Sequence, residues 1–196
     1  MRVLSDEAGS WIWTISGRRF SLTDPRPEDV DIEDIAHSLS LQCRFGGHVR
    51  GSVAYTVAQH SVHVSELCRP EDALWGLMHD ASEAYVVDLP RPVKVLPGIR
   101  EPYAELETRV QRTICLRFGM GFLEPESVRD ADNRVVYAEM LDLMPSLPSA
   151  VRAEYILRAP DPATFAPIHP WPAPYARDMF MRRFDELYRG SLYDLP

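Results

Sequence analysis

The sequence contains no run of basic residues, although proteins that grip polynucleotide backbones normally carry a basic patch. The formal net charge is -8, so we do not expect long DNA or RNA as a partner. A small anionic ligand is still compatible with this charge, because one metal ion and a few local cations can outweigh it.

Cysteines are few and none forms a Cys-x-x-Cys pair. Cys43, Cys68 and Cys115 cannot all be bridged to one another, which favours a reducing compartment and a role as small buried hydrophobic residues. No apolar run reaches membrane-spanning length, and Asp6 and Glu7 stand where a signal peptide would need apolar residues. We therefore expect a cytoplasmic protein without a membrane partner. The sequence leaves a homo-oligomer open.

Length and composition indicate one globular domain. The 196 residues can bury a proper core, and 45% hydrophobic with 26% charged residues is an ordinary globular balance. We predict a single, mainly α-helical domain, a helical bundle with a small N-terminal β-hairpin. Its core spans about residues 11–144, followed by a Pro-rich irregular segment at 145–174 and a C-terminal helix at about 176–188.

The hairpin and the first helices follow from hydrophobic periodicity. Trp11–Ile15 and Arg19–Leu22 are β-prone runs around a Gly17 turn. Ile32, Ile35, Ala36 and Leu39 share one face of a short helix, and Val57, Ser61, Val64 and Leu67 mark the next. Three further helices are expected. The first has Glu71 and Asp72 in its first turn, and its apolar face consists of Leu74, Leu77, Met78 and Ala81. The second runs from about Pro102 to Phe118 and is closed by Gly119, and the third runs from Ser127, as its cap, to Met144.

Histidines and acids interrupt helical stretches that should otherwise be apolar. His60 and the His79-Asp80 pair stand in or beside buried stripes, where an unpaired polar group costs several kcal/mol. Asp132 lies on the core side of its helix, whereas Asp130 faces the opposite side because each residue turns by about 100°. Two imidazoles and two carboxylates converging from three helices predict a mixed N/O site for a divalent transition metal.

A family resemblance extends this interpretation. The run from His79-Asp80-Ala81-Ser82-Glu83-Ala84 through Asp88-Leu89-Pro90-Arg91-Pro92-Val93-Lys94 resembles bacterial HD-domain deoxynucleotidases and the related phage-encoded dATP triphosphohydrolases. The upstream segments Asp34–Leu39, Cys43–His48 and Tyr55–Val62 are similar to the phage-type members in particular, and Ala131-Asp132-Asn133 with Glu139 fits the last metal-binding helix of the family. The match covers about Trp11 to Met144, and it implies a bacterial or phage-infected host cytosol as the compartment.

The resemblance implies a role for each matching residue. His60, His79, Asp80 and Asp132 would hold one divalent ion, for which Co²⁺, Mn²⁺, Zn²⁺ and Fe²⁺ are all candidates, with Mg²⁺ arriving on the substrate. Glu83, one helical turn beyond His79, would handle protons for the attacking water, and Asp88 would orient that water or the substrate. The phosphate oxygens would be held by Arg44 and Lys94. Asp88 as a local backbone cap is an equal alternative.

Several neighbouring residues receive weaker assignments. Trp11, Trp13 and Phe45 are candidates to stack a base. Core packing is the favoured role of the two tryptophans, and Phe45, beside Arg44, is a candidate wall of the nucleotide pocket. His63 is expected on the helix surface and His37 in a structural or supporting position. The role of His48 stays open.

The resemblance implies hydrolysis of a deoxynucleotide. A dNTP triphosphohydrolase releasing tripolyphosphate is the preferred interpretation, because the N-terminal half is phage-like and two cations could hold several phosphates. The alternative is a 5′-deoxynucleotidase that releases phosphate from a dNMP. A non-catalytic nucleotide-binding module is a rival of another class, which the presence of Glu83 beside the complete set of ligands disfavours. Hydrolysis of an alarmone or a cyclic nucleotide is a third, and the extra histidines of the cyclic-nucleotide branch are not found.

Overall fold

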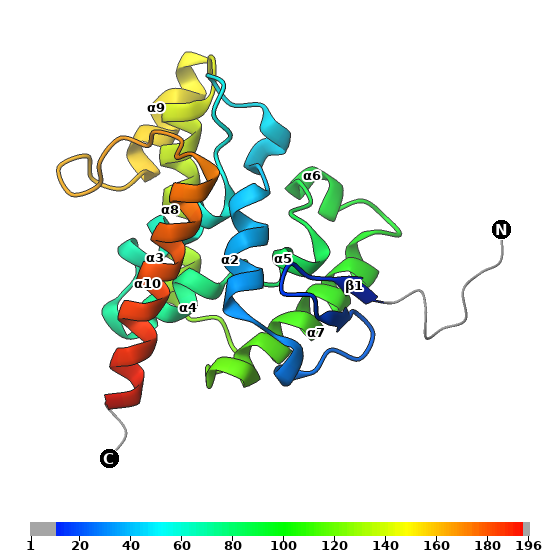
Figure 1. Cartoon of the computed structure of the whole chain (residues 1–196). Coiled ribbons are helices and arrows are strands. Elements are labelled where there is room, and N and C mark those ends of the chain that lie inside the picture. Colours follow the sequence, from blue (N-terminus) through cyan, green and yellow to red (C-terminus); the bar gives the residue numbers. More distant parts are fainter. Residues whose placement is uncertain (1–10, 194–196) are drawn as a thin grey trace.

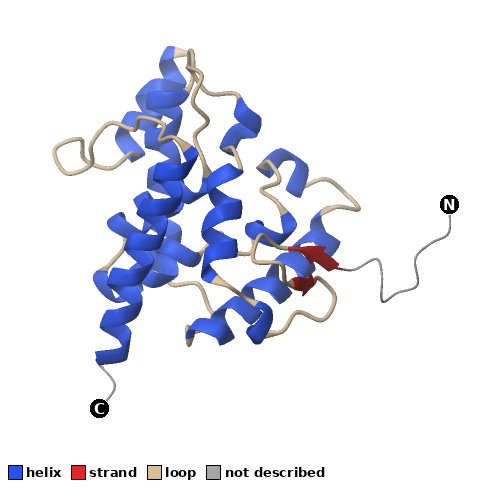
Figure 2. Cartoon of the chain, viewed as in Figure 1, coloured by secondary structure: helices blue, strands red, loops and turns tan. Residues whose placement is uncertain are grey.

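The computed structural model describes residues 11–193, with side chains as far as Tyr188. Helices dominate, and β1 (Trp11–Trp13) pairs with β2 (Arg19–Ser21) in a small antiparallel sheet (Figure 2). The predicted fold class, mainly α with an N-terminal hairpin, is confirmed to that extent. Among the described residues, no helix is both long and apolar enough to cross a membrane. The expectation about a signal peptide concerns residues 1–10 and lies outside the described part of the chain.

The hairpin is anchored to the helical body by one aromatic stack. Gly17 adopts a positive φ of 77° in the turn, a conformation that glycine reaches without steric cost. Phe20, opposite Ile12 in the sheet, is fully buried, and its ring stacks on Tyr85 with centroids 3.8 Å apart. Tyr85 belongs to α5 (Glu83–Val86), so the hairpin supports a short helix that carries a predicted catalytic residue.

The central helix is α3 (Val57–Leu67), which begins where the Thr56 hydroxyl accepts a hydrogen bond from the Gln59 amide. Four helices pack against it (Figure 1): α2 (Ile32–Leu41), α4 (Ala73–Met78), α8 (Glu126–Leu143) and α10 (Ala173–Tyr193). Because α3 is enclosed on nearly every side, its polar residues Gln59 and His60 are fully buried. Buried polar groups of this kind need internal partners.

Two other predicted helices have the expected faces and ends. The helix α2 buries Ile35, Ala36 and Leu39, and its first turn is capped by the Asp31 carboxylate. The helix α7 (Arg100–Phe118) ends at Gly119, whose φ of 68° is left-handed, as expected for a glycine that closes a helix.

The predicted third helix is wrong as one continuous element. Residues Pro70–Asp72, which include the acids of the expected first turn, form a separate 3₁₀ turn, and α4 ends at Met78. The Gly76 carbonyl accepts the ring N–H of His79 at 2.8 Å. The next backbone bonds, from Ala81 to Met78 and from Glu83 to Asp80, span three residues instead of four. The side chain of His79 thus takes a backbone carbonyl that a continuing helix would use, and His79 and Asp80 lie in a turn.

The expectation of an irregular segment throughout 145–174 is also wrong. A helix, α9 (Ser149–Arg158), occupies the proline-free stretch between Pro148 and Pro160. A proline just before a helix does not disturb it, because the first N–H groups lack intrahelical partners anyway. The final helix α10 adds Ala176, Phe180 and Phe184 to the main core, so the C-terminal part of the chain helps to close the bundle.

The prediction that Ser127 caps α8 is wrong, because the helix begins at Glu126 after Pro125. The Ser127 hydroxyl instead donates to the Asp72 carboxylate. A short unpredicted helix, α6 (Arg91–Lys94), follows the Asp88–Pro92 break.

The environment of the cysteines and of Trp13 differs in part from expectation. Cys115 is buried, Cys68 is partly buried and Cys43 is exposed, so only Cys115 fits the predicted role fully. Trp13 is 66% exposed, which is wrong for a core residue, and Trp11 is half-buried edge-on against it. Both tryptophans sit on a two-stranded sheet with one solvent face, so alternation alone could not place them in the core.

Candidate metal centre

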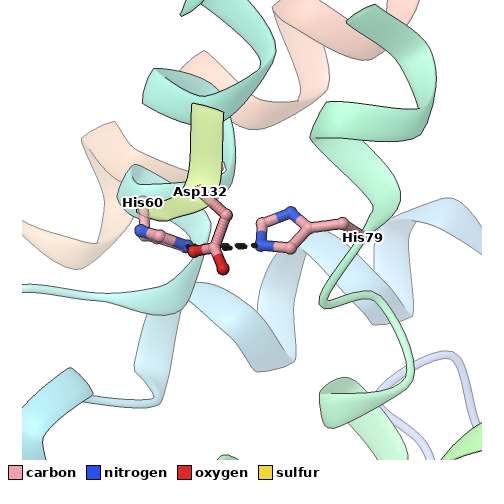
Figure 3. A group of neighbouring side chains, drawn as sticks. All are labelled: His60, His79 and Asp132. Atoms are coloured by element: carbon pink, nitrogen blue, oxygen red, sulfur yellow. Dashed lines mark hydrogen bonds and ion pairs between the residues drawn. The ribbon is translucent and has the colours of Figure 1, made fainter. Parts of the chain in front are cut away.

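Three parts of the fold bring the four predicted ligands together. His60 comes from α3, His79 and Asp80 from the turn after α4, and Asp132 from α8. The imidazoles of His60 and His79 and the carboxylate of Asp132 converge on one point (Figure 3). One ligand atom from each of these three residues lies within 4.8 Å of the others, so the group could hold a metal ion.

The distances between the ligand atoms suit a shared ion. The Nε2 atoms of His60 and His79 are 3.2 Å apart. Asp132 Oδ1 lies 3.1 Å from His60 Nε2 and 3.9 Å from His79 Nε2, while Asp80 Oδ2 lies 3.7 and 3.2 Å from the same two atoms. Ligands about 2.1 Å from one ion are separated by about 3–4.2 Å. All five separations fall in this range, so the donor set fits a divalent metal with nitrogen and oxygen ligands.

The hydrogen bonds of the two histidines leave their Nε2 atoms facing each other. His60 Nδ1 lies 2.6 Å from Glu139 Oε1, and His79 Nδ1 lies 2.8 Å from the Gly76 carbonyl. Both partners are acceptors, so each Nδ1 donates its proton. In a neutral ring whose Nδ1 donates in this way, Nε2 keeps a lone pair with which it can bind a metal.

The electrostatics of the centre also favour a cation. Burial opposes the charged form of the Asp80 carboxylate, but His79, His60 and Arg44 outweigh it and lower its pKa. The pKa of Asp132 is lowered against burial by His60 and His79. Burial lowers the pKa of His79, yet Asp80 and Asp132 raise it to about 9. The negative charge of the two aspartates thus draws positive charge to the imidazoles.

A buried carboxylate lies behind the ligands. Glu139, on α8, is fully buried and accepts hydrogen bonds from His60 and from the Tyr55 hydroxyl at 2.8 Å. Its other oxygen faces Arg44 Nη2 at 3.3 Å. Burial opposes the charged form of Glu139, but Arg44 and His60 outweigh it and lower its pKa to about 2. Glu139 therefore stays charged and joins a predicted metal ligand to the predicted phosphate-binding arginine.

The prediction that Asp132, rather than Asp130, faces inward is confirmed. The Asp132 side chain reaches the two histidines, whereas Asp130 is 66% exposed and pairs with Arg134 on the helix surface. Apolar Val128, Ala131 and Val135 share the buried side of α8.

Glu83, which is buried, and Lys94, which is partly exposed, form an ion pair close to the centre. Lys94 Nζ lies 3.0 Å from Glu83 Oε1 and 2.8 Å from Glu107 Oε1 on α7. The Glu83 side chain is only 4% exposed, and its Oε2 is buried without a hydrogen-bond partner among the described residues. Burial, with help from Asp80 and Asp88, raises the pKa of Glu83 to about 8, although Lys94 opposes this. The expected helical register between His79 and Glu83 does not exist, because the turn at residues 79–82 separates them.

The side chain of Gln42 fixes the backbone of Asp88 just after the end of α5. The Gln42 amide donates to the Glu83 carbonyl and accepts from the Asp88 N–H, both at 3.0 Å. Between them, Val87 has φ 72° and ψ 148°, close to a region that only glycine adopts readily. Burial raises the pKa of the half-buried Asp88 carboxyl, and its backbone is bound by Gln42 rather than capped by its own side chain.

Arg44 and Phe45 form one side of the centre, within a 3₁₀ turn (Arg44–Gly47). Arg44 is mostly buried, and its guanidinium lies 3.5 Å from Asp80 and 3.3 Å from Glu139. The guanidinium carbon lies 5.6 Å from the centre of the Phe45 ring. Phe45 itself has φ 55°, an unusual conformation for a bulky residue, and packs against the cluster around Tyr55. Arg44 is thus fixed beside the predicted ligands.

The remaining histidines are placed elsewhere. His63 is wrong as a surface residue, because its ring packs between Phe165 and Trp171 under the Pro-rich segment. His37 lines a separate groove of about 430 Å³ with Trp13 and Leu41. His48 is exposed.

Sequence reasoning missed three polar residues that support the centre. Gln42 and Tyr55 act through contacts with residues far along the chain, for which local patterns carry no signal. The family resemblance includes Glu139 but implies no role for it. The residue lies seven positions after Asp132, two turns along the same face of the helix. A charged residue in the apolar stripe of α8 was the available clue.

The fold and the site define a mainly α-helical protein with a partly buried His/Asp group able to hold a metal ion. Two relatives match nearly the whole chain. An uncharacterized protein of Rhodobacter capsulatus is 35% identical over 192 residues, which span 92% of this chain and 97% of the relative. The uncharacterized protein YfdR of Escherichia coli is 36% identical over 179 residues, spanning 91% and 96%. The chain belongs to the family of these two proteins. No family model matches it.

Proposed function

We propose that this protein is a metal-dependent phosphohydrolase of the HD-domain kind that acts on a small deoxynucleotide. The observation that carries the proposal is the pair of Nε2 atoms 3.2 Å apart, each with its Nδ1 proton already donated, next to two aspartates. This arrangement is stable once a divalent cation joins the four side chains.

The bound ion would supply an acidified water and polarise a phosphoryl oxygen. The residues of the chain would supply the remaining chemistry. Glu83 is buried, has one oxygen without a partner, and has a pKa near neutrality, which suits a group that holds and releases a proton. Lys94 fixes the other oxygen of Glu83, and Asp88 would orient the water or the substrate.

The charge balance of the centre bears on the substrate. Arg44 already faces Asp80 and Glu139, and Lys94 already faces Glu83 and Glu107. The dNTP interpretation requires Arg44 and Lys94 to neutralise several phosphates, but each cation already faces two carboxylates. A monophosphate adds the least negative charge to such a site, so this observation favours the 5′-deoxynucleotidase reaction. A dNTP would need to bring its own Mg²⁺.

A nucleotide-binding module without turnover is the rival. Glu83 argues against it, because burying a carboxylate with an unpartnered oxygen costs stability and is retained most readily where it serves chemistry. In a site that only binds a nucleotide, nothing would offset the stability lost by burying this oxygen.

The test is a product screen over dNMPs, dNTPs and ribonucleotides with Mn²⁺, Co²⁺ and Zn²⁺. Orthophosphate from dNMPs supports the nucleotidase reaction, and tripolyphosphate from dNTPs supports the triphosphohydrolase. Tight binding of a nucleotide without any product, with every metal, would favour the binding module. His79→Ala, which removes one predicted ligand, is the control for a contaminating phosphatase.

A further inference from the structure

The buried carboxylate of Glu139 has no role in the chemistry proposed above, although it contacts two residues that do. It is fully buried, and burying a charged carboxylate is costly unless several partners compensate. Its partners are His60 Nδ1 at 2.6 Å, the Tyr55 hydroxyl at 2.8 Å and Arg44 Nη2 at 3.3 Å. All three are donors, so the carboxylate is compensated and its orientation is fixed.

We infer that Glu139 is a positioning residue, which fixes the tautomer and the ring orientation of His60 and holds Arg44 beside the same site. The inference rests on the proposed metal centre. An acceptor at Nδ1 forces the ring proton onto that atom and leaves the Nε2 lone pair directed at His79 and Asp132. A charged acceptor also makes Nε2 a better donor to a metal.

His60 depends on this contact more than His79 does. The Nδ1 proton of His79 is held by the backbone carbonyl of Gly76, only three residues earlier in the chain. The Nδ1 proton of His60 is held by a side chain 79 residues further along the sequence. The carboxylate and the Asp132 ligand share α8, so the docking of α8 on α3 delivers a ligand and the residue that orients another ligand together.

The experiment compares Glu139→Gln with Asp130→Asn, an exposed acid on the same helix, in the full-length chain. Glutamine keeps the shape of the side chain but removes the charge. We expect Glu139→Gln to weaken Zn²⁺ or Co²⁺ binding by about 10–100-fold, the usual cost of losing such a partner. Asp130→Asn should bind the metal as the unmodified protein does. The NMR signal of the His60 Nδ1 proton should lie far downfield in the unmodified protein and in Asp130→Asn, and should move upfield or disappear in Glu139→Gln, because an amide oxygen accepts more weakly than a carboxylate.

Equal metal affinity and an unchanged His60 proton signal in Glu139→Gln would overturn the inference. A loss of metal binding with the signal unchanged would also overturn it, because the carboxylate would then act in some way other than through His60. If the unmodified protein binds no metal, the proposed function fails, and the proton signal alone decides the inference: an upfield shift or loss of the signal in Glu139→Gln supports it, and an unchanged signal overturns it. Tyr55→Phe leaves the Glu139–His60 contact in place and should weaken metal binding less than Glu139→Gln does.

Discussion

His60 and His79 face each other through their Nε2 atoms at 3.2 Å, while their Nδ1 atoms contact Glu139 and the Gly76 carbonyl. The pairing joins the central helix α3 to the turn that ends α4. Two acceptors placed behind the rings, and two aspartates placed beside them, make this pair suited to hold a metal ion.

Metal content should depend on Asp132 and not on Asp130. Replacing either acid by asparagine removes one charge from the same helix, but only Asp132 reaches the histidines. Metal analysis after loading and gel filtration should find about one ion per chain in Asp130→Asn and a strongly reduced content in Asp132→Asn. Equal content in both variants would contradict the assignment of Asp132.

Glu83→Gln should act on turnover rather than on binding. The substitution preserves the volume of a buried side chain but removes its capacity to exchange a proton, so kcat should fall by about a hundredfold or more with little change in KM. Glu107→Gln is the matched variant, because Glu107 contacts the same lysine from α7 and should reduce kcat much less. Normal turnover in Glu83→Gln would move the proton-handling role to Asp88 or to the metal centre alone.

Arg44→Ala should damage both stability and substrate binding. Removing a cation from a fully buried carboxylate typically costs about 3–5 kcal/mol, and Glu139 would lose such a partner. Lys94→Ala should cost less stability, because its side chain is 27% exposed. Each variant should weaken nucleotide binding by about 1.5–3 kcal/mol if the cation contacts a phosphate. Urea unfolding and equilibrium nucleotide binding measure the two effects separately. Unchanged nucleotide affinity in both variants would leave these residues only a structural role.

Val87→Gly should stabilise the protein. Val87 is 57% exposed and has φ 72°, so glycine would lose little packing and would relieve backbone strain. The net gain in the free energy of unfolding should be about 1 kcal/mol, after the entropy cost of glycine. Val95→Gly is the control: Val95 is 58% exposed but has φ -94°, so the same change should destabilise. A loss of stability in Val87→Gly would show that the conformation of Val87 carries no strain.

The sequence was sufficient for the elements whose signals are local. The bounds of α3 and the Gly119 end of α7 follow from periodicity, a proline and a helix-closing glycine. The inward face of Asp132 follows from helical angles alone. The break after Met78 does not, because it depends on a His79 side chain that binds a backbone carbonyl. The proline content of residues 145–174 does not predict α9, because the helix occupies a proline-free stretch within that segment.

The support of the site was less predictable than the ligands themselves. His60, His79, Asp80 and Asp132 are unusual in apolar surroundings and can be picked out one at a time. The roles of Gln42 and Tyr55 exist only once α5 and α8 have packed beside them. Likewise, the acids that form ion pairs with Arg44 and Lys94 come from three different helices and the turn after α4.

The most direct test of the central claim is a metal titration of phosphate release. The protein is stripped with a chelator and supplied with dNMP, and Mn²⁺ or Co²⁺ is added in fractions of the chain concentration. We expect no release from the stripped protein, and a rate that rises with added metal and levels off near one ion per chain. Release that persists at full rate after stripping, in a chain shown to contain no metal, would contradict the central claim.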